Sequence, residues 1–271
     1  MSAGWDGRGT DPWLPDRLAN LTDLAQAEVD LRDDYWARLS RWLVRVARAV
    51  LRGHRPDPHA VWSLAPDWST EIEGFVNGSV RQVMAVAYRR LFGDGYRFDH
   101  RPSVTAYLAL VGNRMSSTPD DVFDAISGEI AEGAGQGESI RTVADRVDRL
   151  LTEHSAGRWP NRAVVVARTE TLGALNAGRA DAFTAVADEL NDRRFDRMWL
   201  ATADTRTRPS HREADGQRQP LGTRFSVGGH DLDRPGDPLA PPSEVIQCRC
   251  SILLLRPGEN VDLSNRQYTD W

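Results

Sequence analysis

The sequence predicts an α+β protein, in which an all-helical N-terminal part with long amphipathic helices is followed by a C-terminal domain of helices plus a small antiparallel sheet. Two observations lead to this fold class. Apolar residues recur at three- and four-residue steps up to about residue 190, a spacing that places them on one face of each helix. Beyond residue 195, short stretches rich in β-branched and aromatic residues stand between turn-forming residues, which is typical of strands.

The first predicted helix spans residues 15–51, and Pro56 and Pro58 follow its end. A second helix is predicted over residues 68–92, where the sequence GDGY ends it, and a third over residues 103–114. A helix as long as the first is longer than a compact domain of this size needs. Such helices usually pack in bundles or assemblies.

The next helix has a clear start signal. Thr118 is expected to cap it, Pro119 to occupy its first position, and the two Asp residues that follow to favour the positive end of the helix dipole. The helical pattern restarts over residues 139–151 and again over residues 160–190.

The glycine-rich stretch 133–137 is predicted to be a hinge between domains. We place the boundary there because the composition changes across it. Residues 1–135 then form a helical N-terminal region, residues 136–256 a second domain, and residues 257–271 a polar tail.

Three strands are predicted over residues 196–202, 222–229 and 245–255. A loop rich in Pro and Gly, residues 230–244, precedes the last strand. Loops of this length usually need a ligand, a partner or side-chain contacts to fix their conformation.

The overall composition is that of a folded protein. Hydrophobic residues make up 40% of the 271 residues and include nine Trp, which is enough for at least one core. The net charge of −5 argues against a protein that coats nucleic acid through its overall charge. The N-terminal segment lacks the pattern of a signal peptide, and every apolar run is far shorter than the roughly 20 residues that span a bilayer. We therefore expect a soluble protein made in the cytoplasm, with no membrane partner.

Polar residues interrupt the apolar pattern of the helix over residues 160–190. Thr169 and Asn176 lie two turns apart on one face, with Glu170 beside them. Glu170 could act as a general base with the Asn176 amide orienting a substrate. The alternative, which we favour, is a charge-assisted hydrogen bond between this helix and Arg206 or Arg208.

A second polar cluster follows the first predicted strand. Asp204 and the Asp215–Gly216 pair are residue types that form tight turns. His211 lies between them, and a single His beside a strand is more often a hydrogen-bonded structural group than a ligand.

The two Cys residues of the chain, Cys248 and Cys250, would form a strained loop if bridged, so we expect them to be reduced. Together with His211 they could supply three of the four ligands of a zinc ion. Against zinc, Cys-x-Cys is not the spacing of a zinc knuckle. The alternative is that the thiols pack as small hydrophobic groups on a buried strand. A fourth zinc ligand could come from Asp204, Asp215 or His230.

Other catalytic patterns are weaker. The chain has no G-x-S-x-G nucleophile elbow and no glycine-rich phosphate loop after a strand. A metal-dependent nuclease would need His211 and several carboxylates, such as Asp204, Asp215 and Glu170, around one ion. The residues alone do not choose between this enzyme and a structural motif.

The order of four motifs favours the structural motif over the nuclease. The sequences "ARTETLGALNAGRADAF", "MWLATADTRTRPSHREADGQ", "RPGDP" and "CRC" follow one another between residues 138 and 255. This pattern resembles the C-terminal domain of the phage Mu protein F-like minor head proteins, also called phage head morphogenesis proteins. One departure is Gln247, where the resemblance leads us to expect Asn before the first Cys.

The resemblance implies a minor capsid protein of a tailed phage, located inside the head near the portal and acting in head assembly and in DNA packaging or ejection. It implies the portal protein and the major capsid protein as partners, with packaged DNA as a further candidate. The protein would be in the host cytoplasm during assembly and then in the capsid interior of the virion. It transfers no catalytic residue, so we do not expect an enzyme. The alternatives are a metal-dependent nuclease or toxin-like enzyme that uses His211 and nearby carboxylates, and a binding module delivered to the host with the DNA.

The family pattern falls on residues that we interpret as a structural motif, with zinc held by His211, Cys248 and Cys250 as a further hypothesis. We predict that this motif joins the helix that carries Glu170 to the cysteine-bearing strand through the turn between them. The motif residues are Arg168, Thr169, Glu170, Asn176, Trp199, Asp204, Arg206, Arg208, His211, Asp215, Gly216, Pro235, Gly236, Asp237 and Pro238, with Cys248, Arg249 and Cys250 at its end.

Overall fold

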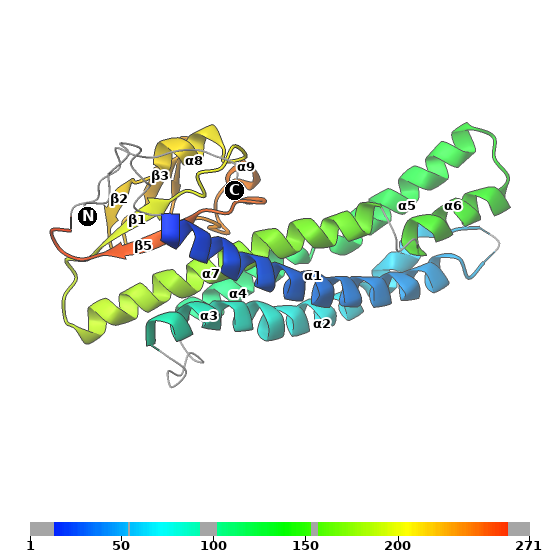
Figure 1. The fold of residues 1–271 in the computed structure, drawn as a ribbon. Helices are drawn as coiled ribbons and strands as arrows, with labels where there is room; N and C mark the ends of the chain where they lie inside the picture. The colour runs from blue at the N-terminus through cyan, green and yellow to red at the C-terminus, as the bar shows by residue number, and fades with distance from the viewer. Residues whose placement is uncertain (1–13, 54, 93–101, 153–156, 260–271) are drawn as a thin grey trace, which may run out of the picture. The chain divides into compact units, whose positions relative to one another are not determined.

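A computed structural model describes residues 14–53, 55–92, 102–152 and 157–259. It confirms the predicted α+β class, because long helices precede a small three-stranded antiparallel sheet and a two-stranded hairpin (Figure 1). Among the helices in the described ranges, none has both the length and the apolar character needed to cross a membrane.

The described residues pack as two compact units. One unit holds the residues up to Glu28, those within Val83–Val104 and those from Arg168 onward, and the other holds Val29–Gln82 and Thr105–Ala167. The boundary predicted at residue 135 concerns sequence composition and stays a prediction.

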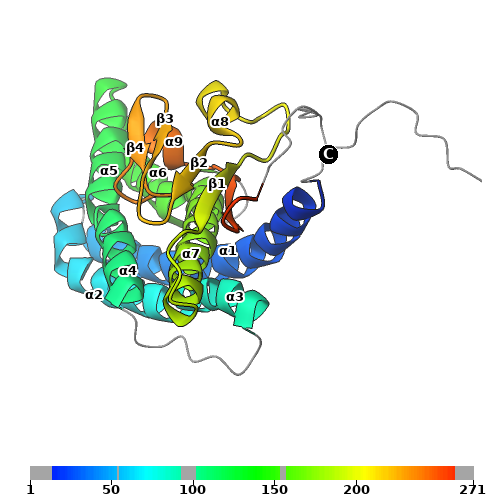
Figure 2. The ribbon, with the colours of Figure 1, turned by 90° about the vertical axis from the view of Figure 1, so that its left-hand side faces the viewer.

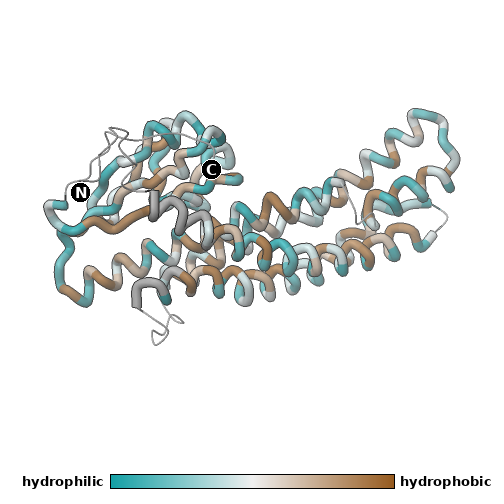
Figure 3. The backbone as a smooth tube through the Cα atoms, in the orientation of Figure 1, coloured by the Kyte–Doolittle hydropathy of each residue, from teal (hydrophilic) through white to brown (hydrophobic). Residues whose placement is uncertain are grey.

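The helix α1, Leu14–Val50, confirms the first predicted helix. Its apolar stripe is visible where brown segments alternate with teal ones along the tube (Figure 3). In the second unit, Tyr35, Leu39 and Trp42 of α1 are fully buried. Tyr35 meets Trp68 and Phe75 edge-on, with ring centroids 6.0 and 5.5 Å apart, a geometry that aromatic rings favour. These aromatic rings form the core of that unit.

The predicted second helix is a run of helical segments. It starts earlier than predicted because Pro66 fits the first turn of a helix. The predicted stop at residues 93–96 lies outside the described residues. The segments are α2 Ala65–Phe75, the π-helical η2 Val76–Val80 and α3 Arg81–Phe92, and the short helix η1 Pro58–Leu64 precedes them. The helix α4, Pro102–Met115, confirms the third predicted helix.

The helices α5, Thr118–Gly135, and α6, Ile140–Thr152, form a hairpin through the predicted glycine-rich turn. Gly133 lets the two helices approach, since a Cβ there would lie 2.7 Å from a Val143 methyl group. The prediction that Thr118 caps α5 is wrong. The hydroxyl of Thr118 instead donates to the carbonyl of Met115, 3.0 Å away, and the cap residue Ser117 makes no side-chain capping bond.

The helix α7, Arg158–Glu189, precedes the sheet. The strand order is β2-β1-β5, with antiparallel pairing throughout and Trp199 of β1 opposite Ile252 of β5. Figures 1 and 2 both show this sheet beside α7. The elements after α7 are β1 Asp196–Leu200, α8 Pro209–Ala214, β2 Arg218–Pro220, β3 Phe225–Val227, β4 His230–Leu232, α9 Pro242–Val245 and β5 Ser251–Leu255.

All three predicted strands are shorter in the structure, and the first, β1, ends at Leu200. The strand expected over residues 222–229 covers only β3, which pairs with the unpredicted β4 at the start of the Pro/Gly loop. The strand expected over residues 245–255 begins only at Ser251, because Gln247 has a left-handed backbone, with φ of 58°. The two cysteines therefore precede β5 and are not part of it.

Candidate functional site

The residues that join the predicted motifs lie in the cysteine segment, which we define as residues 244–251. It runs from the end of α9 to the start of β5. The side chains of Cys248 and Cys250 are buried, each with 2% exposure. Asn tolerates the left-handed conformation of Gln247 better than Gln does, so the Asn expected from the resemblance would suit this backbone.

The helix α7 contacts the cysteine segment directly. The amide of Asn176, which is fully buried, donates to the carbonyl of Cys250 at 2.9 Å and to the carbonyl of Pro235 at 3.2 Å. The Thr169 hydroxyl accepts a hydrogen bond from the backbone N–H of Gln247 at 3.3 Å. These bonds satisfy backbone groups that no strand or helix would otherwise pair.

The motif turn, residues 204–216, contacts the other side of the cysteine segment. The carboxylate of Asp204 accepts a hydrogen bond from Arg249, and the guanidinium of Arg208 donates to the carbonyl of Ile246. Arg206 is mostly exposed and lies beside Asp204, with 3.6 Å between the nearest charged atoms. Among the described contacts of Arg206 and Arg208, none reaches α7.

The predicted bond from α7 to Arg206 or Arg208 is therefore wrong. The cysteine segment lies between the helix and the motif turn and bonds to both. Glu170, the partner expected for these arginines, is a buried residue of α7 with 5% exposure.

Asp204 is the charged centre of the motif turn. Burial raises the pKa of its carboxyl, but the hydrogen bonds from Arg249 and Thr207 outweigh this effect and hold the pKa below its usual value. Thr207 also closes the turn, since its backbone N–H donates to the carbonyl of Asp204 at 3.1 Å. Asp204 is thus an ionised structural group.

The end of the motif turn is fixed to β1. The Asp215 carboxylate accepts the backbone N–H of Ala201 at 2.8 Å, and the N–H of Gly216 donates to the carbonyl of Trp199 at 2.8 Å. Gly216 has φ of 80°, which explains the glycine predicted in this turn.

The Pro/Gly loop is fixed by internal contacts and by α7. The carboxylate of Asp237 accepts the N–H groups of Asp233 and Leu239, both at 2.9 Å, and so closes the turn that also holds Pro238. Gly236 has φ of 77°, and a Cβ at this position would lie 2.8 Å from the Cα of Gly173 in α7. The loop therefore touches the helix backbone where two glycines meet.

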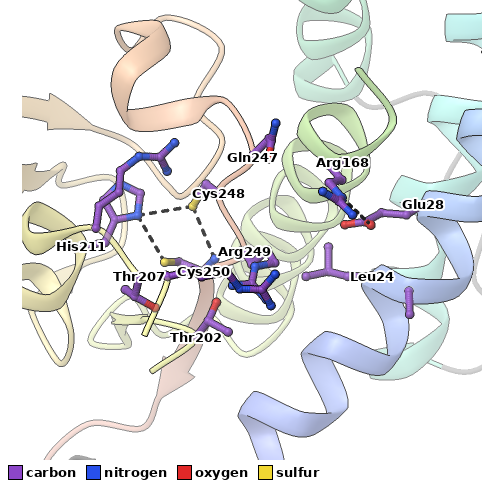
Figure 4. A pocket seen from close by; sticks show the side chains of 13 residues that line it. Leu24, Glu28, Arg168, Thr202, Thr207, His211, Gln247, Cys248, Arg249 and Cys250 are labelled. Carbon is purple, nitrogen blue, oxygen red and sulfur yellow. Dashed lines mark hydrogen bonds and ion pairs between the residues drawn. The ribbon is translucent and has the colours of Figure 1, made fainter. Parts of the chain in front are cut away.

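His211 faces both cysteines. Its Nδ1 lies 3.5 Å from the Cys248 sulfur and 3.4 Å from the Cys250 sulfur. Figure 4 marks both contacts with dashed lines. Its Nε2 lies 3.0 Å from a carboxylate oxygen of Glu244. The ring of Trp199 meets the imidazole edge-on at 5.4 Å, so the His211 ring is held from three sides.

The two thiols titrate as a coupled pair. The hydrogen bond with Cys248, together with burial, raises the pKa of Cys250 well above its usual value. Burial also raises the pKa of Cys248, but the hydrogen bonds from Cys250 outweigh it and lower this pKa. Of the pair, Cys248 gives up its proton first.

A cavity of about 390 Å³ adjoins the cluster within the same unit, and His211, Cys248 and Cys250 all line it. Arg168 lies on its wall, where its Nε is 3.4 Å from a Glu28 carboxylate oxygen. Burial raises the pKa of Glu28, and the charge of Arg168 offsets part of that rise. The other cationic side chains of the wall are Arg206, Arg208 and Arg249.

Within the described part of the chain, the group of His, Cys, Asp and Glu side chains close enough to share a metal ion is His211, Cys248 and Cys250, whose ligand atoms lie within 4.8 Å of one another. Asp204 and Asp215 are engaged with Arg249 and Ala201 instead. Asp204, Asp215 and Glu170, the carboxylates that the nuclease hypothesis places around His211, are not members of this group.

Comparison with known proteins places this site in a family. Residues 121–253 match the family described as Phage Mu protein F like protein. This part of the chain belongs to that family. No solved structure matched the chain.

Two curated proteins are similar to the chain that carries this Mu F-like region. The minor head protein GP7 of Bacillus phage SPP1 is 29% identical over 151 residues, which is 55% of this chain and 46% of GP7. The NAD(+)–arginine ADP-ribosyltransferase EFV of Enterococcus faecalis is 26% identical over 176 residues, which is 59% of this chain and 34% of that protein. The matches span less than half the length of either relative.

Three residues of the Mu F-like region were not predicted as site residues. Glu244 orients His211, although 33 residues separate them. Arg179 donates to the Ser251 hydroxyl at 2.8 Å. Arg197 is 3% exposed and bonds Asp233 at 3.1 Å. Arg197 could have been predicted as a site residue because it lies within the strand sequence "DRMWL", next to apolar residues, and buried charges need partners.

Proposed function

We propose that the protein is a minor capsid protein of a tailed phage, located inside the head near the portal and acting in head assembly and in DNA packaging or ejection. Its partners would be the portal protein and the major capsid protein, with packaged DNA as a further contact. It would be in the host cytoplasm during assembly and in the capsid interior afterwards.

The observation that supports this proposal most is the match of residues 121–253 to the Mu F-like family, together with the similarity to a protein named as a minor head protein. The geometry agrees with a structural role. Asp204, Asp215, Asn176 and Asp237 each hold backbone or side-chain groups of the fold, so these polar residues are engaged in the structure and are not directed at a substrate.

The experiment uses particles of the source phage purified on a density gradient after nuclease treatment. Mass spectrometry is expected to find the chain in the heads, and external protease is expected to spare it until the heads are opened. Cross-linking is expected to join it to the portal protein. Absence from purified heads, or cleavage in intact heads, would overturn the proposed location.

The enzymatic alternative needs a separate test. Purified protein is incubated with plasmid DNA and Mg²⁺, Mn²⁺ or Zn²⁺, beside the variant His211→Ala. We expect no cleavage above that of the variant. Cleavage that the variant abolishes would support the metal-dependent nuclease instead.

A further inference from the structure

We propose that His211, Cys248 and Cys250 form a zinc site with three protein ligands, the imidazole Nδ1 and two thiolates, and that its fourth ligand comes from the arginine-lined cavity. This inference goes beyond the proposed role in the head and does not depend on it.

The distances fit a tetrahedral ion. With Zn–S bonds of about 2.3 Å and a Zn–N bond of about 2.05 Å, tetrahedral angles place sulfur and nitrogen about 3.5 Å apart. The structure has Nδ1 at 3.5 Å from one sulfur and 3.4 Å from the other. Both sulfur–nitrogen distances therefore fit one ion, and all three ligand atoms lie within 4.8 Å of one another.

The imidazole is oriented for this purpose. Glu244 lies 3.0 Å from Nε2, so its carboxylate accepts a hydrogen bond from Nε2–H, and the lone pair of Nδ1 is directed at the sulfurs. Metal-bound histidines usually donate the N–H of the second nitrogen to a carboxylate, a backbone carbonyl or water. The Ser210 hydroxyl donates to the same carboxylate oxygen at 2.8 Å and holds it in place.

The hydrogen bonding of the sulfurs also favours metal binding. The backbone N–H of Cys250 donates to the sulfur of Cys248 at 3.4 Å, an arrangement that favours the thiolate form. Without an ion, the single lone pair of Nδ1 can accept only one of the two thiol protons. A metal ion uses both sulfurs and the nitrogen together.

The fourth ligand is not expected to be a protein group. Asp204 is held by Arg249 and Asp215 by Ala201, and His230 lies exposed on β4. Three protein ligands with one open position are typical of zinc sites that bind an external molecule. The cationic wall of the cavity would attract anionic ligands, with phosphate and carboxylate as the favoured chemical classes.

The test measures metal in the full chain, purified without a metal-affinity tag or chelator and then dialysed against a slight excess of zinc followed by buffer. We expect about one zinc ion per chain by elemental analysis. His211→Ala and Cys248→Ser are expected to lose it, whereas the matched control His230→Ala retains it. Glu244→Gln should weaken zinc affinity by about 10- to 100-fold, because Glu244 positions His211 and does not touch the ion.

Cobalt provides a readout that does not depend on the variants folding. The wild-type chain loaded with Co²⁺ is expected to show thiolate-to-cobalt charge-transfer absorption and the visible bands of a tetrahedral ion, and added inorganic phosphate should shift the visible bands. Less than about 0.2 zinc per chain and no charge-transfer band would overturn the site. Cobalt bands that phosphate leaves unchanged would overturn the open fourth position. Neither result would alter the presence or absence of the chain in purified heads.

Discussion

The amide of Asn176 gives the sharpest test of how α7 is joined to the rest of its unit. It donates to the carbonyls of Cys250 and Pro235, which belong to two different loops, and its oxygen accepts from Arg179 at 3.2 Å. Asn176→Ala leaves two buried carbonyls without this donor. An unsatisfied buried polar group costs about 1–3 kcal/mol, so with two such carbonyls the variant is expected to lose about 2–6 kcal/mol of unfolding free energy.

The assay is urea unfolding followed by circular dichroism, with Asn161→Ala as the matched control. Asn161 is an exposed residue of the same helix, so its substitution is expected to change the unfolding free energy by no more than about 0.5 kcal/mol. Equal unfolding free energies of the two variants would contradict this prediction, because the buried amide would then stabilise the fold no more than an exposed one.

Two further predictions concern the same unit. Gly236→Ala is expected to destabilise the protein more than Gly222→Ala: both residues have positive φ, at 77° and 83°, but only the first would place its Cβ against the backbone of Gly173. Equal melting temperatures for the two variants would argue against that close contact. Burial raises the pKa of Asp181 to about 6, from 3.8, so the stability it contributes is complete below about pH 4 and is lost as the pH rises through about 6. Asp181→Asn should melt higher than wild type at pH 7 and show a smaller fall in melting temperature between pH 4 and pH 7; an unchanged pH profile would count against a raised pKa.

The long helices could be predicted from sequence because their signal is local and repeated. The apolar stripe of α1 lies within one segment, so the periodicity identifies it. The start of α5 is likewise marked locally by Pro119 and the two Asp residues after it, although Thr118 does not cap the helix. The strands β2 and β4 were missed because each has three residues and a largely polar sequence, and both form by pairing with strands elsewhere in the chain. Their structure depends on partners that local propensity does not show.

Most residues of the site could be predicted from the sequence, but the contacts between them could not. The sequence indicates Asp204 and several arginines as site residues, but it does not show that Arg249 is the arginine that bonds Asp204. Similarly, Glu244 reaches His211 only because the Pro/Gly loop brings α9 back beside α8. Contacts across 33 or 45 residues are set by tertiary packing, which no spacing rule encodes.

The central claim is that the cysteine segment contacts both α7 and the motif turn. Amide hydrogen exchange of the peptide spanning residues 245–252 tests it most directly, in wild type and in the variants Asn176→Ala, Asp204→Asn and Asn161→Ala. The first two substitutions, one on each side, are both expected to speed exchange in this one peptide, while the third leaves it unchanged. Protection that persists in both of the first two variants would contradict the claim.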